Sequence, residues 1–415
     1  MTQSRERAQY GARANEYAQT KLPTPFPRTM GPNCMQYLQE VVESGLTSDM
    51  IQRFETAFAA ELGVKHCIAT PGCTPALAVL AASFDFAPGD EIIVSPVTDF
   101  GTVQGLIKEN YIPIFPDTEP GTINMSAATI EPCITERTRA ILAVHMTGII
   151  CDMDPINELA ARHNLIVYED ACQAVFGQYK GRYAGTLATA AGFSFDAEKT
   201  LGSDVGGCIV TDDDQLEARA RLVGQSRGGE MVPHFGRVHV VNGFAHRMTL
   251  STAAITLAQL EIIKPQVEQR DRMVRLLSQQ LAAIPGITPL PIPDYLDVYS
   301  CWMVGLNIDE AAFTCNAEVF AEQLAEAGIA GAGQGKYYLM PDGLKFLQEA
   351  AEQQIYPYSQ PTASRKCRYS GADCPTAQEF LQSFIRWSTF SEKYEEDHCE
   401  LAAGIVEEVA ARNRG

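Results

Sequence analysis

Short apolar runs alternate with segments of helical spacing through the first half of the chain. The runs are nearly continuous in apolar residues, which is typical of strands buried on both faces of a parallel sheet. This order predicts an α/β fold in which helices cover the sheet and ligands bind beyond the carboxyl ends of the strands. The expected strands are 67–70, 91–94, 112–115, 140–145 and 165–168, and the expected helices are 76–82, 102–110, 126–132 and 155–163. Asp154 is expected to cap the last of these helices.

The remainder of the chain is expected to add an arm and a second domain. With 415 residues, the chain is longer than one hydrophobic core usually holds. Residues 1–33 are polar and rich in proline, and they are expected to form an arm that packs on a partner subunit or frays. A large domain is expected over 34–265, and a smaller α+β domain over 266–415.

Charge and cysteine content exclude several classes of function. Acidic residues outnumber basic ones by 51 to 32, and the net charge of -19 opposes binding to nucleic acid or anionic membranes. The 12 cysteines include no Cys-x-x-Cys pair, and His234 and His239 have no neighbouring ligands, so no metal site is expected. Scattered thiols, a polar N-terminal segment and the lack of a long apolar run predict a cytoplasmic protein.

Polar groups at two expected strand ends suggest a binding site. Thr74 is expected to cap a helix that begins at Pro75, and with Gly72 and Cys73 it lies where free N–H groups favour a phosphate. Asp170 follows the strand 165–168, and a buried carboxylate needs a partner such as a protonated ring nitrogen. Taken singly, the first feature is better explained as an ordinary capped helix, and the second as a capping or salt-bridged aspartate.

Lys199 supplies the third part of this pattern. It lies between two apolar runs, 193–195 and 206–211, although most lysines are solvated. A phosphate cradle, a carboxylate and a lysine together predict a pyridoxal 5'-phosphate site. Lys199 would form a Schiff base with the cofactor, and Asp170 would keep the pyridine nitrogen protonated. Burial lowers the pKa of a lysine and so favours the nucleophilic free amine.

The order and spacing of these groups resemble the DegT/DnrJ/EryC1/StrS family, the pyridoxal phosphate-dependent aminotransferases of sugars and cyclitols. The resemblance covers nearly the whole chain, and its most specific part is the spacing of Asp170, Ser194 and Lys199. It implies the type I fold of pyridoxal phosphate-dependent transferases. In that fold, a large domain with a mostly parallel seven-stranded sheet precedes a smaller α+β domain. The resemblance also implies a homodimer.

The resemblance also implies roles for individual residues. Lys199 matches the Schiff-base lysine, Asp170 matches the aspartate that pairs with the ring nitrogen, and Gln173 matches a glutamine beside the ring. The matching residues that bind the cofactor phosphate are Cys73, Thr74 and Ser194.

One departure from the family pattern concerns the group that covers the cofactor ring. The family has an aromatic residue after the second strand that stacks on the ring, whereas Asp99 occupies this position here. Phe100 is the next residue, and a local bulge would be needed to bring its ring over the cofactor.

A second departure concerns the contact between subunits. The family has an asparagine, two residues before the arginine that matches Arg247, which reaches the cofactor phosphate of the partner. Ala245 occupies that position, so Asn242 or His246 replaces the asparagine or the contact is lost. Three arginines of this segment are expected either to hold a substrate carboxylate or phosphate or to be solvated: Arg227, Arg237 and Arg247.

A glycine-rich run at 331–336 is interpreted as a loop of the small domain. It follows an expected helix instead of a strand, and Tyr337 stands where a phosphate-binding loop needs Ser or Thr.

The leading functional hypothesis is therefore an aminotransferase. Glutamate or glutamine would donate the amine, and a keto-sugar or keto-cyclitol would accept it, with Lys199 as the base in both half-reactions. One alternative is a sugar dehydratase of the same fold, but histidine typically replaces the lysine in those enzymes. The other is a regulator that binds pyridoxal phosphate without turnover, and the absence of a basic appendage counts against a DNA-binding regulator.

Overall fold

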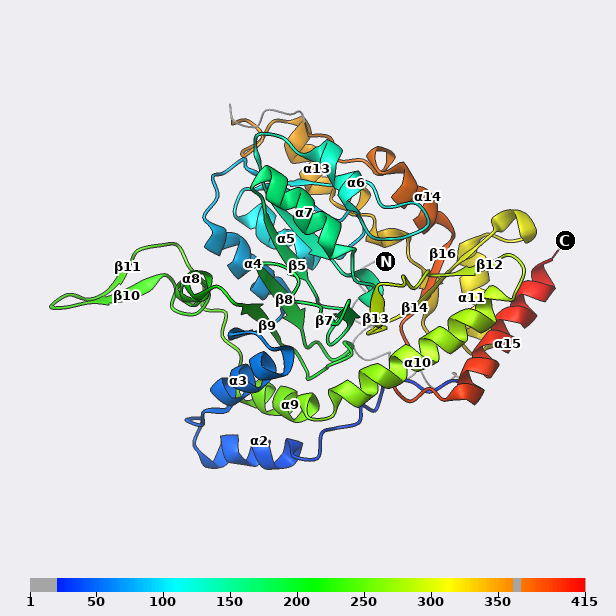
Figure 1. Ribbon diagram of the computed structural model, residues 1–415, viewed down its shortest axis with the longest axis horizontal. Helices are drawn as coiled ribbons and strands as arrows, with labels where there is room; N and C mark the ends of the chain where they lie inside the picture. The colour runs from blue at the N-terminus through cyan, green and yellow to red at the C-terminus, as the bar shows by residue number, and fades with distance from the viewer. Residues whose placement is uncertain (1–20, 361–366, 415) are drawn as a thin grey trace, which may run out of the picture.

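A seven-stranded sheet forms the centre of the larger part of the molecule (Figure 1). The computed structural model describes residues 21–360 and 367–414. The strand order is β1-β9-β8-β5-β4-β2-β3, and pairing is parallel from β3 to β8 but antiparallel for β8–β9 and β1–β9. The predicted α/β fold with a mostly parallel sheet is thus confirmed. The strands are β1 (His66–Thr70), β2 (Glu91–Val94), β3 (Ile112–Ile114), β4 (Thr138–Val144), β5 (Ile166–Asp170), β8 (Ala190–Ser194) and β9 (Gly207–Thr211).

Helices cover both faces of this sheet, as the continuous apolar strands require. Successive residues of β8 point to opposite faces. A Cβ at Gly192 would lie 2.9 Å from the side chain of Leu77 on one face, whereas Phe193 packs edge-on against Phe58 on the other. The helices of this part are α2 (Cys34–Glu43), α3 (Met50–Leu62), α4 (Cys73–Phe84), α5 (Phe100–Lys108), α6 (Ala127–Ile130), α7 (Met153–His163), α8 (Asp214–Gly224) and α9 (Leu250–Leu260).

Two helix starts differ from the prediction. Helix α4 begins at Cys73 with Gly72 as its N-cap, so Thr74 is not the cap. Helix α7 begins at Met153, after Asp152, and Asp154 lies inside its first turn. The carboxylate of Asp154 is paired with Lys180 and Arg182, at 2.8 and 2.7 Å, and it therefore does not cap its own helix.

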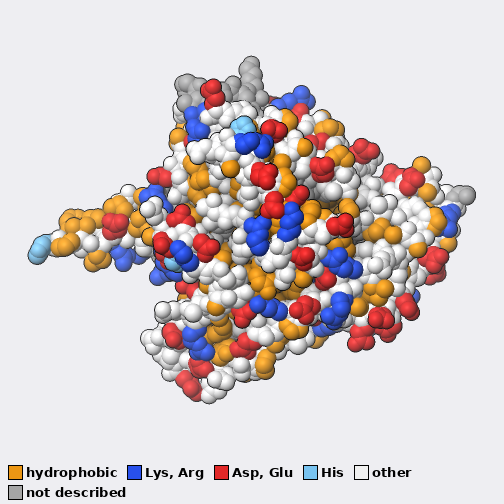
Figure 2. Space-filling model, in the orientation of Figure 1, with side chains coloured by type: hydrophobic (Ala, Val, Ile, Leu, Met, Phe, Trp, Pro, Cys, Tyr) orange, Lys and Arg blue, Asp and Glu red, His pale blue; other side chains and the backbone are white. Residues whose placement is uncertain are grey.

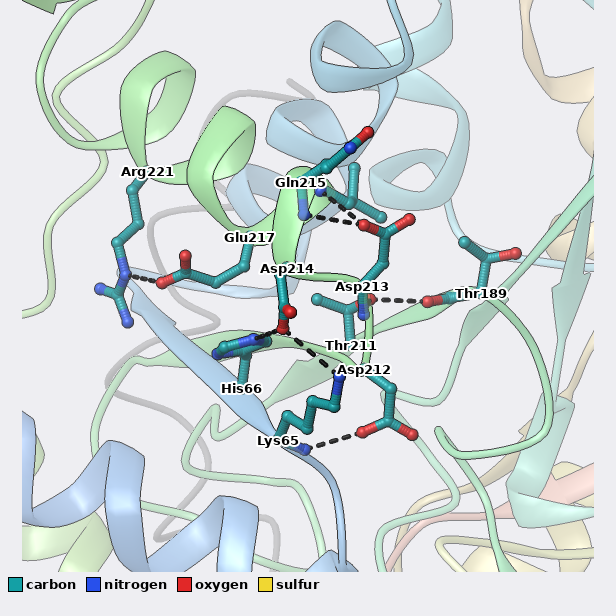
Figure 3. Close-up of polar contacts among 11 residues, drawn as sticks. Lys65, His66, Thr189, Thr211, Asp212, Asp213, Asp214, Gln215, Glu217 and Arg221 are labelled. Atoms are coloured by element: carbon teal, nitrogen blue, oxygen red, sulfur yellow. Dashed lines mark hydrogen bonds and ion pairs between the residues drawn. The ribbon is translucent and has the colours of Figure 1, made fainter.

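The start of α8 ties the antiparallel edge of the sheet together (Figure 3). The carboxylate of Asp213 accepts hydrogen bonds from the N–H groups of Gln215 and Leu216, at 2.8 and 3.0 Å. The next residue, Asp214, lies 2.8 Å from Nε2 of His66 on β1. The first turn of α8 is therefore both capped and attached to the edge strand.

A second, antiparallel sheet with the order β12-β14-β16-β15 lies in the C-terminal part. Strand β13 (Leu296–Val298) instead pairs with β6 (Gln178–Tyr179), which in turn pairs with β7 (Arg182–Tyr183). The strands of the second sheet are β12 (Ile287–Pro289), β14 (Val304–Ile308), β15 (Ala332–Gln334) and β16 (Phe384–Trp387). The helices are α10 (Ile263–Ala282), α11 (Ala317–Ala327), α12 (Met340–Gly343), α13 (Lys345–Glu352), α14 (Pro375–Ser383) and α15 (Glu396–Asn413).

Helix α10 runs across the expected domain boundary, and α15 packs beside it. We propose the division into a large domain, 34–265, and a small domain, 266–415, because the two sheets lie on either side of this boundary. Within the described residues, no helix combines the length and the apolar character needed to cross a membrane. The run 331–336 is not a loop throughout, since β15 occupies its centre and pairs with β16.

The described part of the N-terminal arm packs on its own chain. The N–H of Gly31 donates to Oε1 of Gln259 on α9 at 2.7 Å, and Nζ of Lys393 donates to the carbonyl of Pro27 at 2.6 Å. From residue 21 onward the arm is therefore ordered by intrachain contacts, while residues 1–20 lie outside the described part.

One hairpin projects from the body of the molecule (Figure 1). It consists of β10 (Gly229–Val232) and β11 (Gly236–His239), joined by a turn that contains Phe235. Met231 and Phe235 are 73% and 76% exposed, and apolar side chains are visible along the hairpin (Figure 2).

Candidate active site

A cavity of about 710 Å³ opens at the carboxyl ends of the central strands. All seven residues predicted to bind the cofactor lie in its wall, although they come from three separate stretches of the chain. These residues are Gly72, Cys73, Thr74, Asp170, Gln173, Ser194 and Lys199.

Lys199 lies in the segment 196–202, directly after the strand β8. Its backbone N–H donates to the carbonyl of Asp196 at 2.9 Å. Its Nζ atom lies 3.8 Å from the ring centroid of Trp302, and the indole Nε1–H of that residue donates to the carbonyl of Glu198 at 2.9 Å. The tryptophan therefore contacts both the amine and the backbone of this segment, and a cation over an indole face is a favourable pairing.

Arg28, from the N-terminal arm, holds the same segment. Its guanidinium donates to the carbonyls of Ala197, Lys199 and Thr200, at 2.9, 2.5 and 3.0 Å. Burial and the nearby positive charge of Arg270 lower the pKa of Arg28 to about 10, against the opposing effect of acidic neighbours. A guanidinium with five donors suits several carbonyl acceptors at once, so Arg28 fixes the backbone that carries Lys199.

Asp170 is the last residue of β5 and is almost fully buried. Its Oδ2 atom accepts a hydrogen bond from the hydroxyl of Thr102 at 2.7 Å, and its Oδ1 atom accepts from the N–H of Cys172 at 3.1 Å. The Sγ atom of Cys73 lies 3.7 Å from Oδ1. These donors fix the orientation of the carboxylate at the cavity wall, where it can face a cationic group.

The start of helix α4, in the same cavity wall, fits a phosphate. Helix α4 begins without a side-chain cap, so the N–H groups of Cys73 and Thr74 point from an uncapped helix N-terminus. A Cβ at Gly207 would lie 2.4 Å from the carbonyl carbon of Gly72, so only glycine allows this close approach. The hydroxyls of Thr74 and Ser194 complete the set of donors. With Lys199 and Asp170 in the same cavity, the residues present fit pyridoxal 5'-phosphate.

Gln173 is held in the wall by its side-chain oxygen. Oε1 accepts a hydrogen bond from the N–H of Thr147 at 2.5 Å. Thr147 itself has a positive φ of 61°, and it lies in the turn that follows β4. The amide of Gln173 is thus oriented by the neighbouring strand end.

Phe100 is not brought over the cavity, and the bulge that would do so does not occur. The carboxylate of Asp99 accepts from the N–H of Gly101 at 2.9 Å and caps α5, which begins at Phe100. The ring of Phe100 is directed to Phe346, with centroids 6.0 Å apart, and the residue is 37% exposed. Asp99 itself lines the cavity.

Among the described residues, the aromatic side chains in the cavity wall are instead those of Trp302 and Tyr338. Sequence reasoning missed both, because they belong to the C-terminal part and follow β13 and β15. Tyr338 is brought there by backbone pairing, since its carbonyl accepts from the N–H of Thr98 at 3.1 Å. No local pattern around either residue would have indicated this position.

The segment around Ala245 does not line the cavity within one chain. The ring of His246 stacks on Phe244, with centroids 4.7 Å apart, and Asn242 is exposed. Arg247 lines a separate cavity of about 470 Å³, together with Glu55 and Arg221.

Comparison with known proteins agrees with this geometry. The profile of the DegT/DnrJ/EryC1/StrS aminotransferase family matches residues 29–368. The chain belongs to this family. It is therefore a pyridoxal phosphate-dependent aminotransferase, and the family resemblance seen in the sequence is confirmed.

Individual relatives share large parts of the chain. GDP-perosamine synthase from Caulobacter vibrioides is 38% identical over 299 residues, which are 71% of this chain and 80% of that protein. A putative L-glutamine:3-amino-2,3-dideoxy-scyllo-inosose aminotransferase from Micromonospora echinospora is 32% identical over 63% of this chain and 64% of that protein. The crystal structure of 3-amino-5-hydroxybenzoic acid synthase has a TM-score of 0.81 at 24% identity, with 94% and 100% of the two chains covered. This last likeness concerns the fold.

Proposed function

We propose that this aminotransferase moves an amine from glutamate or glutamine to a keto-sugar or keto-cyclitol. The single observation that carries the proposal is the cavity that contains Lys199, Asp170 and the uncapped start of α4. Relatives named for the synthesis of GDP-perosamine and for a scyllo-inosose aminotransfer support an acceptor of the sugar or cyclitol class.

The residues predicted to bind the cofactor have proposed roles in this reaction. When bound, pyridoxal phosphate withdraws electrons from the substrate carbon that carries the nitrogen. The N–H groups of Cys73 and Thr74 and the hydroxyl of Ser194 hold the phosphate. The carboxylate of Asp170 keeps the proton on the ring nitrogen, and Gln173 lies beside the ring.

Lys199 has two proposed tasks, both performed by Nζ. It attaches the cofactor covalently in the resting protein, and it moves a proton at the substrate carbon during the transfer. Trp302 and Arg28 keep the lysine at the cavity wall, as their contacts with the segment indicate. The indole face also restricts water around the amine. The presence of Lys199 also favours amine transfer over the dehydratase alternative, because histidine typically occupies this position in the dehydratases of the same fold.

The substitution Lys199→Ala tests the proposal. The variant is expected to lose the covalent cofactor adduct that borohydride fixes, as measured by the mass of the intact protein. Amine transfer should fall by at least about 10³-fold, since the positioned base is removed. Lys345→Ala, at an exposed residue of α13, is the matched control. A Lys199→Ala protein that retains the adduct or transfers amine normally would overturn the assignment.

We also propose that the protein is a cytoplasmic homodimer. The projecting hairpin β10–β11 supports this assembly, because an isolated two-stranded hairpin is marginally stable in water and this one exposes Met231 and Phe235. A second copy of the chain would cover these side chains.

A further inference from the structure

Two thiols and a carboxylate meet in the wall of the cavity. The Sγ atoms of Cys73 and Cys172 and a carboxylate oxygen of Asp170 all lie within 4.8 Å of one another. Cys73 is the first residue of α4, Asp170 ends β5, and Cys172 follows two residues later. The cluster therefore exists only because the sheet brings the ends of β1 and β5 to the same edge.

The spacing of this cluster suits a small tetrahedral cation. With zinc–sulfur bonds of about 2.3 Å and a zinc–oxygen bond of about 2.0 Å, a tetrahedral ion separates its sulfur and oxygen ligands by about 3.5 Å. The observed separation of Cys73 Sγ and Asp170 Oδ1 is 3.7 Å. Little movement is thus needed for both atoms to bind one ion.

The carboxylate is already oriented by its neighbours. Thr102 donates to Oδ2 at 2.7 Å, and the N–H of Cys172 donates to Oδ1 at 3.1 Å. Such hydrogen bonds to a ligating group are the usual support of a metal site. Both cysteines are only partly buried and line the cavity of about 710 Å³, so a cation and a water molecule can reach them.

We propose that the cofactor-free protein binds one Zn²⁺ ion through Cys73, Asp170 and Cys172, with a fourth position open to water. Each thiol loses one proton and forms one zinc–sulfur bond, the carboxylate supplies the third bond, and no redox change occurs. Thiolate ligands select zinc over magnesium or calcium, which prefer oxygen ligands. The site was not expected from the sequence, because Cys73 and Cys172 are far apart along the chain.

The metal and the cofactor would exclude each other, because both use Asp170. This consequence rests on the proposed role of Asp170 at the ring nitrogen, whereas the metal site itself rests only on the three side chains. Zinc would therefore hold the cofactor-free protein in a form that pyridoxal phosphate cannot fill.

Titration of the full-length, cofactor-free protein with Co²⁺ under argon tests the site. Binding is expected at one ion per chain, with the near-ultraviolet absorption of cobalt–thiolate bonds, and Zn²⁺ is expected to abolish this absorption. Cys73→Ala and Cys172→Ser should each weaken Co²⁺ binding by at least about 100-fold. Even substitutions of residues that only hydrogen-bond to metal ligands lower metal affinity by about 10–100-fold.

Cys315→Ser is the matched control, because Cys315 is another partly buried cysteine and lies outside the cavity wall. Circular dichroism verifies that each variant is folded. The proposal is overturned if the absorption is absent, or if both ligand variants bind Co²⁺ like the unaltered protein.

Reconstitution with pyridoxal phosphate in the presence of Zn²⁺ tests the exclusion separately. The concentration of pyridoxal phosphate required for half-saturation should rise in proportion to the concentration of zinc, and Cys172→Ser should remove this dependence. If the cobalt–thiolate absorption appears but Zn²⁺ does not compete with pyridoxal phosphate, the metal site stands and the shared use of Asp170 is overturned.

Discussion

Two segments near the antiparallel end of the sheet are stabilised in opposite ways. The segment 196–202, which carries Lys199, receives three hydrogen bonds from Arg28 and one from Trp302. The hairpin β10–β11, which follows α8, extends away from the body and leaves Met231 and Phe235 exposed (Figure 1, Figure 2). One is fixed within the chain, and the other presents an apolar surface outward.

The difference shows that a single chain stabilises the Lys199 segment by its own contacts, whereas it leaves the apolar side chains of the hairpin exposed. The lysine has to be held accurately, and the contacts that hold it come from Arg28 and Trp302, which are both distant from it in the sequence. The hairpin is held by its own ladder of backbone hydrogen bonds. We therefore expect substitutions in the first segment to affect folding and those in the second to affect association.

The largest effect is expected for Arg28→Ala. Removing the guanidinium leaves three carbonyls without their charged donor and removes one of the two positive charges near Glu392. The free energy of unfolding should fall by about 3–5 kcal/mol, measured by urea denaturation. Arg272→Ala, at an exposed arginine of α10, is the control. Equal effects of the two substitutions would mean that Arg28 does not hold the Lys199 segment.

The double substitution Met231→Ser, Phe235→Ser tests the role of the hairpin β10–β11 in association. If the hairpin packs on a second copy, association should weaken by at least about 100-fold, or about 2.7 kcal/mol, because apolar area is lost from the interface. Sedimentation of the variant over a range of concentrations measures this change.

Ile355→Ser provides the control for the hairpin, because Ile355 is 51% exposed and lies elsewhere on the surface. The monomer should keep its fold, as seen by circular dichroism. Unchanged association of the double variant would contradict the proposed role of the hairpin.

The stability of the protein in acid should depend on Glu392, whose carboxylate lies near Arg270 and Arg28. Burial alone would raise the pKa of Glu392, but the attraction of Arg270, 3.0 Å away, and a backbone hydrogen bond outweigh it and lower the pKa. A carboxyl with a lowered pKa in the fold stabilises the protein above its unfolded pKa. This stabilisation is lost as the pH falls through the folded value.

The melting temperature of the unaltered protein should therefore decrease below about pH 4.3, the ordinary value for glutamate. Glu392→Gln should lower the stability by about 1.5–3 kcal/mol at neutral pH and should flatten the acid limb of the curve. Parallel curves for the two proteins would show that Glu392 is not responsible.

The smallest effect is expected for Trp302→Phe. The substitution keeps an aromatic face near Nζ of Lys199 but removes the hydrogen bond to the carbonyl of Glu198. Stability should fall by about 1 kcal/mol, and amine transfer should fall less than tenfold. Trp302→Leu, which also removes the aromatic face, should be more severe. If Phe and Leu are equivalent, the contact of the ring with the amine is unimportant.

The sequence by itself predicted the sheet, its flanking helices and the seven residues of the cavity. Strand periodicity and the order of Gly72, Asp170 and Lys199 along the chain indicated the position of the site, because parallel strands present their carboxyl ends at one edge. Gln173 and Ser194 were identified only through the family resemblance. Local capping was predicted less well. Thr74 and Asp154 have the chemistry of caps, but the chain turns into the helix one residue or more earlier in both cases.

Only the tertiary structure identified Arg28, Trp302 and Tyr338, and only it brought Cys73 and Cys172 together. Each of these residues acts through a neighbour that is distant in sequence, and no periodicity or motif encodes such a contact. Likewise, the sequence left open whether Phe100 covers the cofactor ring, and the fold directs the side chain of Phe100 to Phe346. Local patterns determine which elements form, while packing between elements determines which side chains share a cavity.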